Sequence, residues 1–493
     1  MLLLGIDVGT SSIKVSVINA ADTKLVASAQ FPETEASIIS QYPGWAEQEP
    51  ESWWQYTCQA IKKLNGSGTY DPKNIVAIGI AYQMHGLVIV DKNKKVLRPS
   101  IIWCDSRAVE TGNKAFEAIG ASYCQQCLLN SPGNFTASKL AWVKQHEPAV
   151  FEKVDKLMLP GDYIAMQLTQ EITISPAALS EGILWDFQSN AVAKEVMDYY
   201  GFSENMIPAV QPVFSVHGNI TTSVAATLGL KAGIPISYKA GDQPNNALSL
   251  NVMQPGEIAA TAGTSGVIYA VSDQLTGDPR SRVNSFAHVN HSATQKSIGV
   301  LLCINGTGIM NRWVKETAGG NLSYRQINEL AAKIPLGSNG LLVLPFGNGA
   351  ERMLENKMMG AQISNLQLTT HQSSHLFRAA QEGIACAFRY GLDILKENGL
   401  RPSVIRAGKA NMFLSDVFTD LFVNFTGTPV ELYENDGAVG AAIGAGIGAG
   451  IYTTPQEAFR NYKPVALAEP KNNHEEYTRI YERWKGLLEK ALS

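Results

Sequence analysis

The stretch LLLGIDVGTSSIKVSV, from Leu2 to Val17, decides the fold of this chain. Its apolar beginning predicts a buried strand, and the alternation from Ile13 to Val17 predicts a second strand after a short turn. Gly9 allows the backbone to turn tightly, and successive N–H groups in such a turn can bind an anion. Taken alone, the same residues also fit an ordinary hairpin with a turn rich in Gly and Ser.

The side chains of this turn suit a polyphosphate and its metal ion. Thr10 and Ser11 add hydroxyl groups to the backbone donors, and Asp7 stands where a carboxylate can hold a hydrated cation.

A second copy of the hairpin favours the phosphate-binding interpretation. Ala259 to Val271 reads AATAGTSGVIYAV, so Gly263–Gly266 repeats the Gly-Thr-Ser turn between two similar strands. Thr261 stands in the second copy where Asp7 stands in the first. Two such hairpins, one near the start of each half, predict a duplicated α/β fold with a cleft between two domains, residues 1–250 and 251–493.

Size and composition agree with a two-domain α/β protein. The chain has 493 residues, which is too long for one ordinary core. Of these residues, 45% are hydrophobic and 17% are charged, as in a soluble α/β protein. A net charge of −4 argues against a broad nucleic-acid surface. We find no signal peptide or membrane span, and we read the scattered cysteines as reduced thiols of a cytoplasmic chain. Cys124 and Cys127 have zinc-like spacing, but no second Cys/His pair complements them.

Two further segments bear on the architecture. The run from Val439 to Gly450 is almost entirely Gly, Ala and Ile, so a helix there requires close packing as compensation for its glycines. His474 to Leu492 predicts a charged terminal helix that covers the domain from the solvent side.

Phosphoryl transfer to a hydroxyl group needs a phosphate cradle, a metal and a base for the hydroxyl proton. Asp242 is the candidate base, because it lies in a Gly-Asp-Gln loop at the end of a predicted strand, where support is rigid. A turn-forming aspartate is the alternative interpretation. Gln83, Met84 and His85 end another predicted strand and suit a polyol, although a single histidine there is more often structural. Asp105 and Arg107 could form an ion pair and nothing else.

The chain resembles the FGGY family of carbohydrate kinases, and within it the xylulokinases. The resemblance runs through almost the whole chain and rests on GIDVGTSSIKV, WAEQEPESWW, YQMHG, IIWCDSR, FTASKLAWVKQHEP, LPGDY and AGTSG. It implies the duplicated actin-like ATPase (ribonuclease H-like) fold and ATP-dependent phosphorylation of D-xylulose at its terminal hydroxyl. A homodimer through the second half is usual among relatives. Two stretches, 349–354 and 407–412, depart from the family pattern.

The resemblance also implies a role for individual residues. Asp242 would be the general base, and Asp7 would hold Mg²⁺ through water. The sugar would be bound by Gln83, Met84, His85, Trp103, Asp105 and Gln243. The nucleotide would be bound by Gly9, Thr10, Ser11, Gly263, Thr264, Gly408 and Asn411.

The sequence leaves two alternatives to a xylulose kinase open. One is a kinase for another ketose or polyol, such as ribulose, fuculose or glycerol. The other is a non-catalytic nucleotide-binding regulator on the same fold.

Overall fold

The computed structural model describes all 493 residues, and its first half is built on a five-stranded sheet. The strand order is β13–β5–β1–β2–β3, in which β2 is antiparallel to β1 and β3, whereas β5 and β13 run parallel to β1. The expected hairpin is formed, with Asp7 opposite Lys14. The strands of this sheet are β1 (Leu2–Val8), β2 (Ile13–Asn19), β3 (Leu25–Phe31), β5 (Ile75–Tyr82) and β13 (Ile236–Gly241).

The second half repeats this topology within a seven-stranded sheet of order β16–β17–β15–β14–β22–β23–β24. Its strands β14, β15, β17, β22 and β23 correspond in order and direction to β1, β2, β3, β5 and β13. The predicted duplication is therefore confirmed. The strands are β14 (Ile258–Ala262), β15 (Gly266–Ser272), β16 (Asn284–Ala287), β17 (Ile298–Ile304), β22 (Ile405–Gly408), β23 (Val430–Tyr433) and β24 (Ala466–Ala468).

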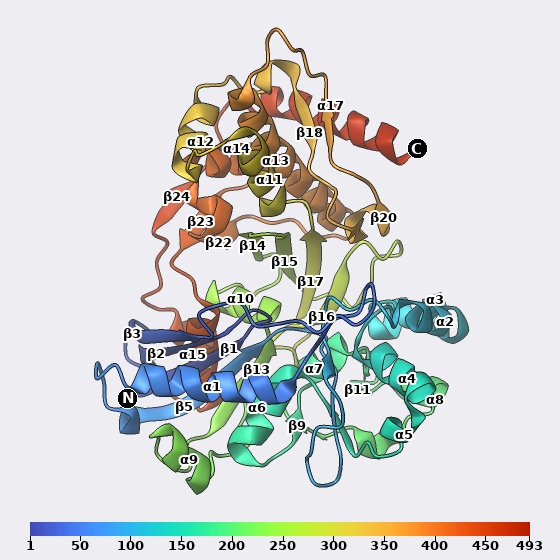
Figure 1. The fold of residues 1–493 in the computed structure, drawn as a ribbon, viewed down its shortest axis with the longest axis vertical. Coiled ribbons are helices and arrows are strands. Elements are labelled where there is room, and N and C mark those ends of the chain that lie inside the picture. The colour runs from blue at the N-terminus through green and yellow to red at the C-terminus, as the bar shows by residue number, and fades with distance from the viewer.

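The Gly/Ala-rich run forms helix α15 (Gly437–Gly448), which packs on the sheet of the first half although it belongs to the end of the chain. Figure 1 shows this late segment among the blue strands of the lower half. A Cβ at Gly5 or at Gly79 would overlap a carbonyl oxygen of α15. This close approach is the packing that the glycines of the helix require as compensation. We propose a domain boundary near residue 250, with α15 packed on the first domain.

Other helices cover the two sheets. In the first half, α1 packs against β2 and β3, and α6 packs against β5 and β13. In the second half, the long α13 contacts β15, β17 and β18 (Leu342–Leu344). The principal helices are α1 (Pro50–Asn65), α2 (Val109–Ile119), α4 (Thr136–His146), α6 (Pro160–Thr169), α7 (Pro176–Glu181), α8 (Lys194–Tyr200), α10 (Asp242–Ser249), α11 (Gly308–Ala318), α12 (Tyr324–Ala332), α13 (Ser373–Glu397), α14 (Asp416–Thr426) and α17 (His474–Leu492).

The terminal helix α17 is more than a solvated cover, and that expectation is wrong for one of its faces. Tyr477, Tyr481, Trp484 and Leu488 are buried, and the indole of Trp484 donates a hydrogen bond to the carbonyl of Val343 at 2.8 Å. These residues are three or four positions apart, so they share one face of the helix, and the charged residues of the helix lie at other positions.

The two halves meet along strand β16, which reaches toward the first half in Figure 1. The amide of Ala287 donates to the hydroxyl of Ser180 at 2.9 Å, and the amide of Ser285 donates to the side chain of Asn130 at 2.9 Å. All six cysteines are free, Cys124 and Cys127 lie within one helical turn, and none of the helices is long and apolar enough to cross a membrane.

Candidate active site

Asp242 is the first residue of α10, directly after β13, and it lines a cavity of about 450 Å³. Met84, His85, Trp103 and Gln243 line the same cavity, so the structure brings five of the predicted residues together. Burial raises the pKa of Asp242 to about 7, with a further rise from the nearby Asp7 and an opposing effect of hydrogen bonds from Gln243. A carboxyl with a pKa near neutrality suits a general base.

Apart from Ser265, which belongs to the predicted phosphate turn, the rest of this cavity was not predicted from the sequence. Its lining mixes amides, apolar side chains and one cation, as a polyol with hydroxyl edges and C–H faces requires. The amide oxygens of Asn134 and Asn284 and the Nε of Arg352 have no hydrogen-bond partner in the protein. Only the departure from the family pattern at 349–354 pointed toward Arg352. The remaining lining residues are Asn134, Phe135, Thr261, Ser265, Val267, Asn284, Leu301, Cys303, Asn305 and Arg352.

A second pocket, of about 390 Å³, lies in the other half and contains Gly263, Thr264 and Asn411. Met412 also lines it, whereas Gly408 and Lys409 do not. The second phosphate-type turn borders both cavities. Gly263 and Thr264 face this pocket, whereas Thr261 and Ser265 face the cavity of Asp242. An anion held at this turn would therefore lie between the two cavities.

The first turn lines neither cavity, but hydrogen bonds connect it to the cavity of Asp242. The indole of Trp103 donates to the hydroxyl of Thr10 at 2.9 Å, and this hydroxyl donates to Gln83 at 3.2 Å. The amide of Gln48 donates to the carbonyl of Thr10 at 2.8 Å, while the side chain of Ser11 is exposed. Gln83 is thus buried behind the turn rather than in the cavity.

Trp103→Phe tests this connection. The hydrogen bond from Trp103 to Thr10 joins the cavity to the first turn. Its loss should therefore raise the KM values for sugar and for nucleotide together, by about two- to tenfold. Steady-state kinetics with each substrate varied in turn would measure both values. Thr10→Ser keeps the hydroxyl and serves as the matched control, with little change expected. A rise in the sugar KM alone would show that Trp103 does not act through Thr10.

Asp7 lies beside the N-terminus of α15, where Gly437 makes room for it, since a Cβ at this position would overlap the Asp7 carboxylate. Burial raises the pKa of Asp7 to about 6, Asp436 raises it further, and Lys14 opposes these effects. Asp436 itself forms an ion pair with Lys14. A carboxylate with a raised pKa is one that a cation would stabilise in its charged form.

Asp7 and its neighbours fit Mg²⁺ only as a site in which water and substrate phosphates supply most of the ligands. No group of three or more His, Cys, Asp or Glu side chains is arranged to hold a metal ion. Mg²⁺ in phosphoryl-transfer sites is commonly held by one or two carboxylates, with water and substrate phosphates as the other ligands. Asp7 offers one such carboxylate.

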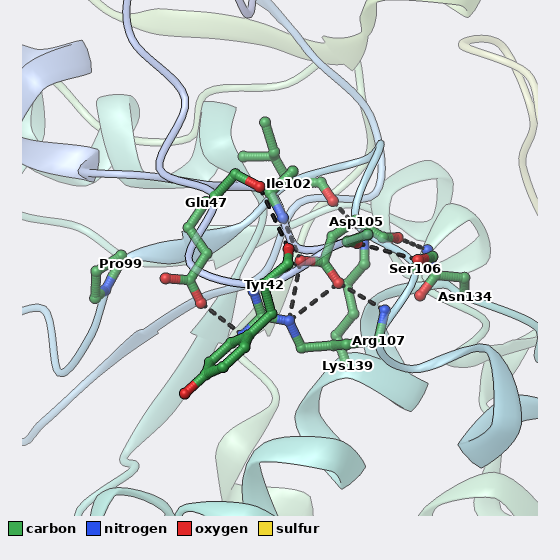
Figure 2. Close-up of polar contacts among 12 residues, drawn as sticks. Tyr42, Glu47, Pro99, Ile102, Asp105, Ser106, Arg107, Asn134 and Lys139 are labelled. Atoms are coloured by element: carbon green, nitrogen blue, oxygen red, sulfur yellow. Dashed lines mark hydrogen bonds and ion pairs between the residues drawn. The ribbon is translucent and has the colours of Figure 1, made fainter. Parts of the chain in front are cut away.

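Asp105 lies behind the cavity and is fully engaged by the protein. Figure 2 shows its carboxylate paired with Arg107, at 2.7 Å, while Arg107 also contacts Glu47 at 2.6 Å. The amide of Ala46 donates to Asp105 as well, at 2.6 Å. The structural ion pair is the interpretation that this geometry supports, so we place Asp105 in an ion pair with Arg107 rather than against a sugar.

Comparison with known proteins agrees with this arrangement. The sequence model of the FGGY family of carbohydrate kinases, N-terminal domain, matches residues 2–249, and the C-terminal domain model matches residues 258–449. The chain belongs to the FGGY family of carbohydrate kinases. It has the two-domain fold of these enzymes, which is of the actin-like ATPase type, and it is a xylulokinase-like carbohydrate kinase.

Several relatives of this FGGY kinase are xylulose kinases. It is 30% identical over 447 residues to the xylulose kinase of Klebsiella pneumoniae, covering 90% of this chain and 88% of that protein. Identity to the xylulose kinase of Escherichia coli (strain K12) is 28%, over 94% and 92% of the two chains. The crystal structure of xylulose kinase from Rhodospirillum rubrum superposes with a TM-score of 0.89 at 26% identity, covering 99% of both chains.

Proposed function

We propose that this enzyme transfers the γ-phosphoryl group of ATP to the terminal hydroxyl of D-xylulose, giving D-xylulose 5-phosphate and ADP. One observation carries the proposal: a single Gly-Thr-Ser turn borders both the cavity of Asp242 and the pocket of Asn411. A triphosphate bound in that pocket would present its last phosphate toward the cavity. The xylulose kinases among the relatives support the choice of sugar.

In the proposed reaction, Asp242 accepts the proton of the sugar hydroxyl as its oxygen forms a bond to the γ-phosphorus. The bond between this phosphorus and the β–γ bridging oxygen breaks, and ADP leaves. Gly263, Thr264 and the first turn would position the phosphates, and Met84, His85, Trp103 and Gln243 would position the sugar. Mg²⁺, when bound near Asp7, would neutralise phosphate charge. We further propose a cytoplasmic location, where ATP is available and the six free cysteines stay reduced.

A sugar panel tests the substrate. ADP release would be followed with D-xylulose, D-ribulose, L-fuculose and glycerol at equal concentrations, and kcat/KM should be highest for D-xylulose. A higher kcat/KM for another compound would mean that the protein is a kinase with a different sugar substrate. If calorimetry detected binding of xylulose or ATP but no compound released ADP, the chain would be a regulator on this fold.

The pH dependence of kcat/KM should report the base. Asp242 must be ionised to accept a proton, so kcat/KM for the sugar should rise as the pH increases through about 7 and then level off. Direct measurement of ADP at saturating ATP would give the profile without coupling enzymes. Asp242→Asn should lack this rise. The same rise in both proteins would assign the titrating group elsewhere.

A further inference from the structure

His85, which lines the cavity, has a backbone that is held in an uncommon conformation. Its φ is +62°, in the left-handed region that side chains other than glycine rarely adopt. Such a conformation persists when the surrounding structure determines it, and it is often found at functional sites.

Two buried ionisable side chains, which the proposed reaction does not use, bind the backbone of His85 from either side. The amide of His85 donates to the carboxyl of Glu181 at 3.2 Å, and its carbonyl accepts a hydrogen bond from Nζ of Lys139 at 2.9 Å. Glu181 is 1% exposed and Lys139 is fully buried. Lys139 also donates to the carbonyl of Ile102, at 3.0 Å, as Figure 2 shows, and so connects His85 to the segment that carries Trp103.

Glu181 also faces the imidazole ring. Nδ1 of His85 lies 3.1 Å from the backbone carbonyl of Glu181 and 3.5 Å from its carboxyl. A carbonyl can only accept, so Nδ1 carries the proton. Burial, and secondarily Lys139, lowers the pKa of His85 to about 3, so the ring is neutral. The second ring nitrogen, Nε2, is then an acceptor, and it has no partner in the protein. The rings of Phe135 and Phe286, at centroid distances of 4.8 Å and 5.2 Å, pack against this imidazole.

We propose that Glu181 and Lys139 are positioning residues that fix the backbone and the tautomer of His85, so that Nε2 accepts a hydrogen bond from a hydroxyl of the sugar. Glu181 does not line the cavity, so it would affect a bound sugar through His85 rather than by direct contact. Its carboxyl also lies close to Gly241, the residue before Asp242. The inference rests on the proposed function for the presence of a sugar, but the tautomer is a property of the free enzyme.

Two variants of Glu181 separate this role from simple packing. Glu181→Gln keeps the shape of the side chain and an oxygen that can accept from the His85 amide. Burial raises the pKa of Glu181 well above its usual range, which favours the neutral carboxyl that glutamine resembles. Glu181→Met fills a similar volume without an acceptor. We expect Glu181→Met to raise the sugar KM about tenfold with little change in the KM for ATP, and Glu181→Gln to stay within about threefold of the wild type.

Tyr82→Phe is the matched control, because the hydroxyl of Tyr82 donates to the other oxygen of the same carboxyl, at 2.7 Å. It disturbs Glu181 without touching His85, so the sugar KM should hardly change. In a His85→Asn background, Glu181→Met should add almost nothing, since both substitutions remove the same interaction. Additive losses would overturn the proposal.

The tautomer itself can be observed by ¹⁵N NMR of histidine-labelled enzyme without substrate, with His85→Asn for assignment. The expected spectrum shows a protonated Nδ1 and an unprotonated Nε2 at neutral pH. A protonated Nε2 would overturn the proposal even in an active kinase. If no sugar is phosphorylated but the spectrum is as expected, the proposed function fails and the arrangement around His85 stands. If Glu181→Met does not fold, Lys139→Met tests the hydrogen bond to the carbonyl of His85 instead.

Discussion

Asp242→Asn is expected to lower kcat by about 10²- to 10⁴-fold, the range that a positioned general base contributes. The Asp242 carboxyl lines the cavity of the candidate site, and burial holds its pKa near neutrality. The amide of asparagine keeps the shape and can still accept a hydrogen bond, but it cannot take the proton. Steady-state ADP release would measure kcat. The Kd values for sugar and nucleotide, from calorimetry, should change only severalfold.

A control and a stability measurement accompany this variant. Asp198→Asn removes an exposed carboxylate on α8 that pairs with Lys194, and it should leave kcat unchanged. The raised pKa of Asp242 means that ionising it costs stability, progressively as the pH rises from about 4 to about 7. Asp242→Asn should therefore unfold at an equal or higher temperature than the wild type at pH 8. Near-normal kcat in a folded Asp242→Asn protein would show that Asp242 is not the base.

Gly79→Ala is expected to destabilise the protein by about 3 kcal/mol or more, at the upper end of the cost of overpacking. Its Cβ would overlap the carbonyl oxygen of Ala441 and lie 2.8 Å from the carbonyl carbon. Both atoms belong to the backbone of α15, which cannot rotate away as a side chain could. The helix must shift off the sheet, and its N-terminus beside Asp7 would shift with it. Urea denaturation followed by circular dichroism would measure the loss.

Gly486→Ala is the matched control for this substitution. Gly486 is exposed in the middle of α17, and nothing lies within 4 Å of a Cβ there. Alanine should stabilise that helix by about 0.5–1 kcal/mol, so the two substitutions are predicted to have opposite signs. Equal stability of Gly79→Ala and the wild type would contradict the tight packing of α15 against β5.

The sequence was informative where a feature is local. The hairpins, their repetition, the position of Asp242 after a strand and the close packing of the Gly/Ala-rich run all follow from short stretches. The lining of the cavity by Asn284 and Arg352 could not be predicted, because it depends on how the two halves face each other. The buried face of α17 was missed because its apolar residues are spaced among many charges.

The partners of polar residues close to a motif could not be predicted from the sequence. Gln83 and Asp105 both lie next to predicted strands. In the structure, however, the side chain of Gln83 donates to Gln48, and that of Asp105 forms an ion pair with Arg107. Whether a side chain meets a ligand or a neighbouring side chain depends on its tertiary partners, which a single sequence does not display. Thr10 is similar, since Gln83 and Trp103 already use its hydroxyl.

The packing of α15 on the first sheet has a consequence for synthesis of the protein. The strands of the first sheet leave the ribosome long before the helix that covers β1 and β5, because this helix consists of residues 437–448. A nascent chain must therefore keep an apolar sheet face exposed until most of the second half has also been translated. Exposed apolar surface makes such species prone to aggregate. This kinase should consequently depend on chaperones during translation more than a protein whose first half closes by itself.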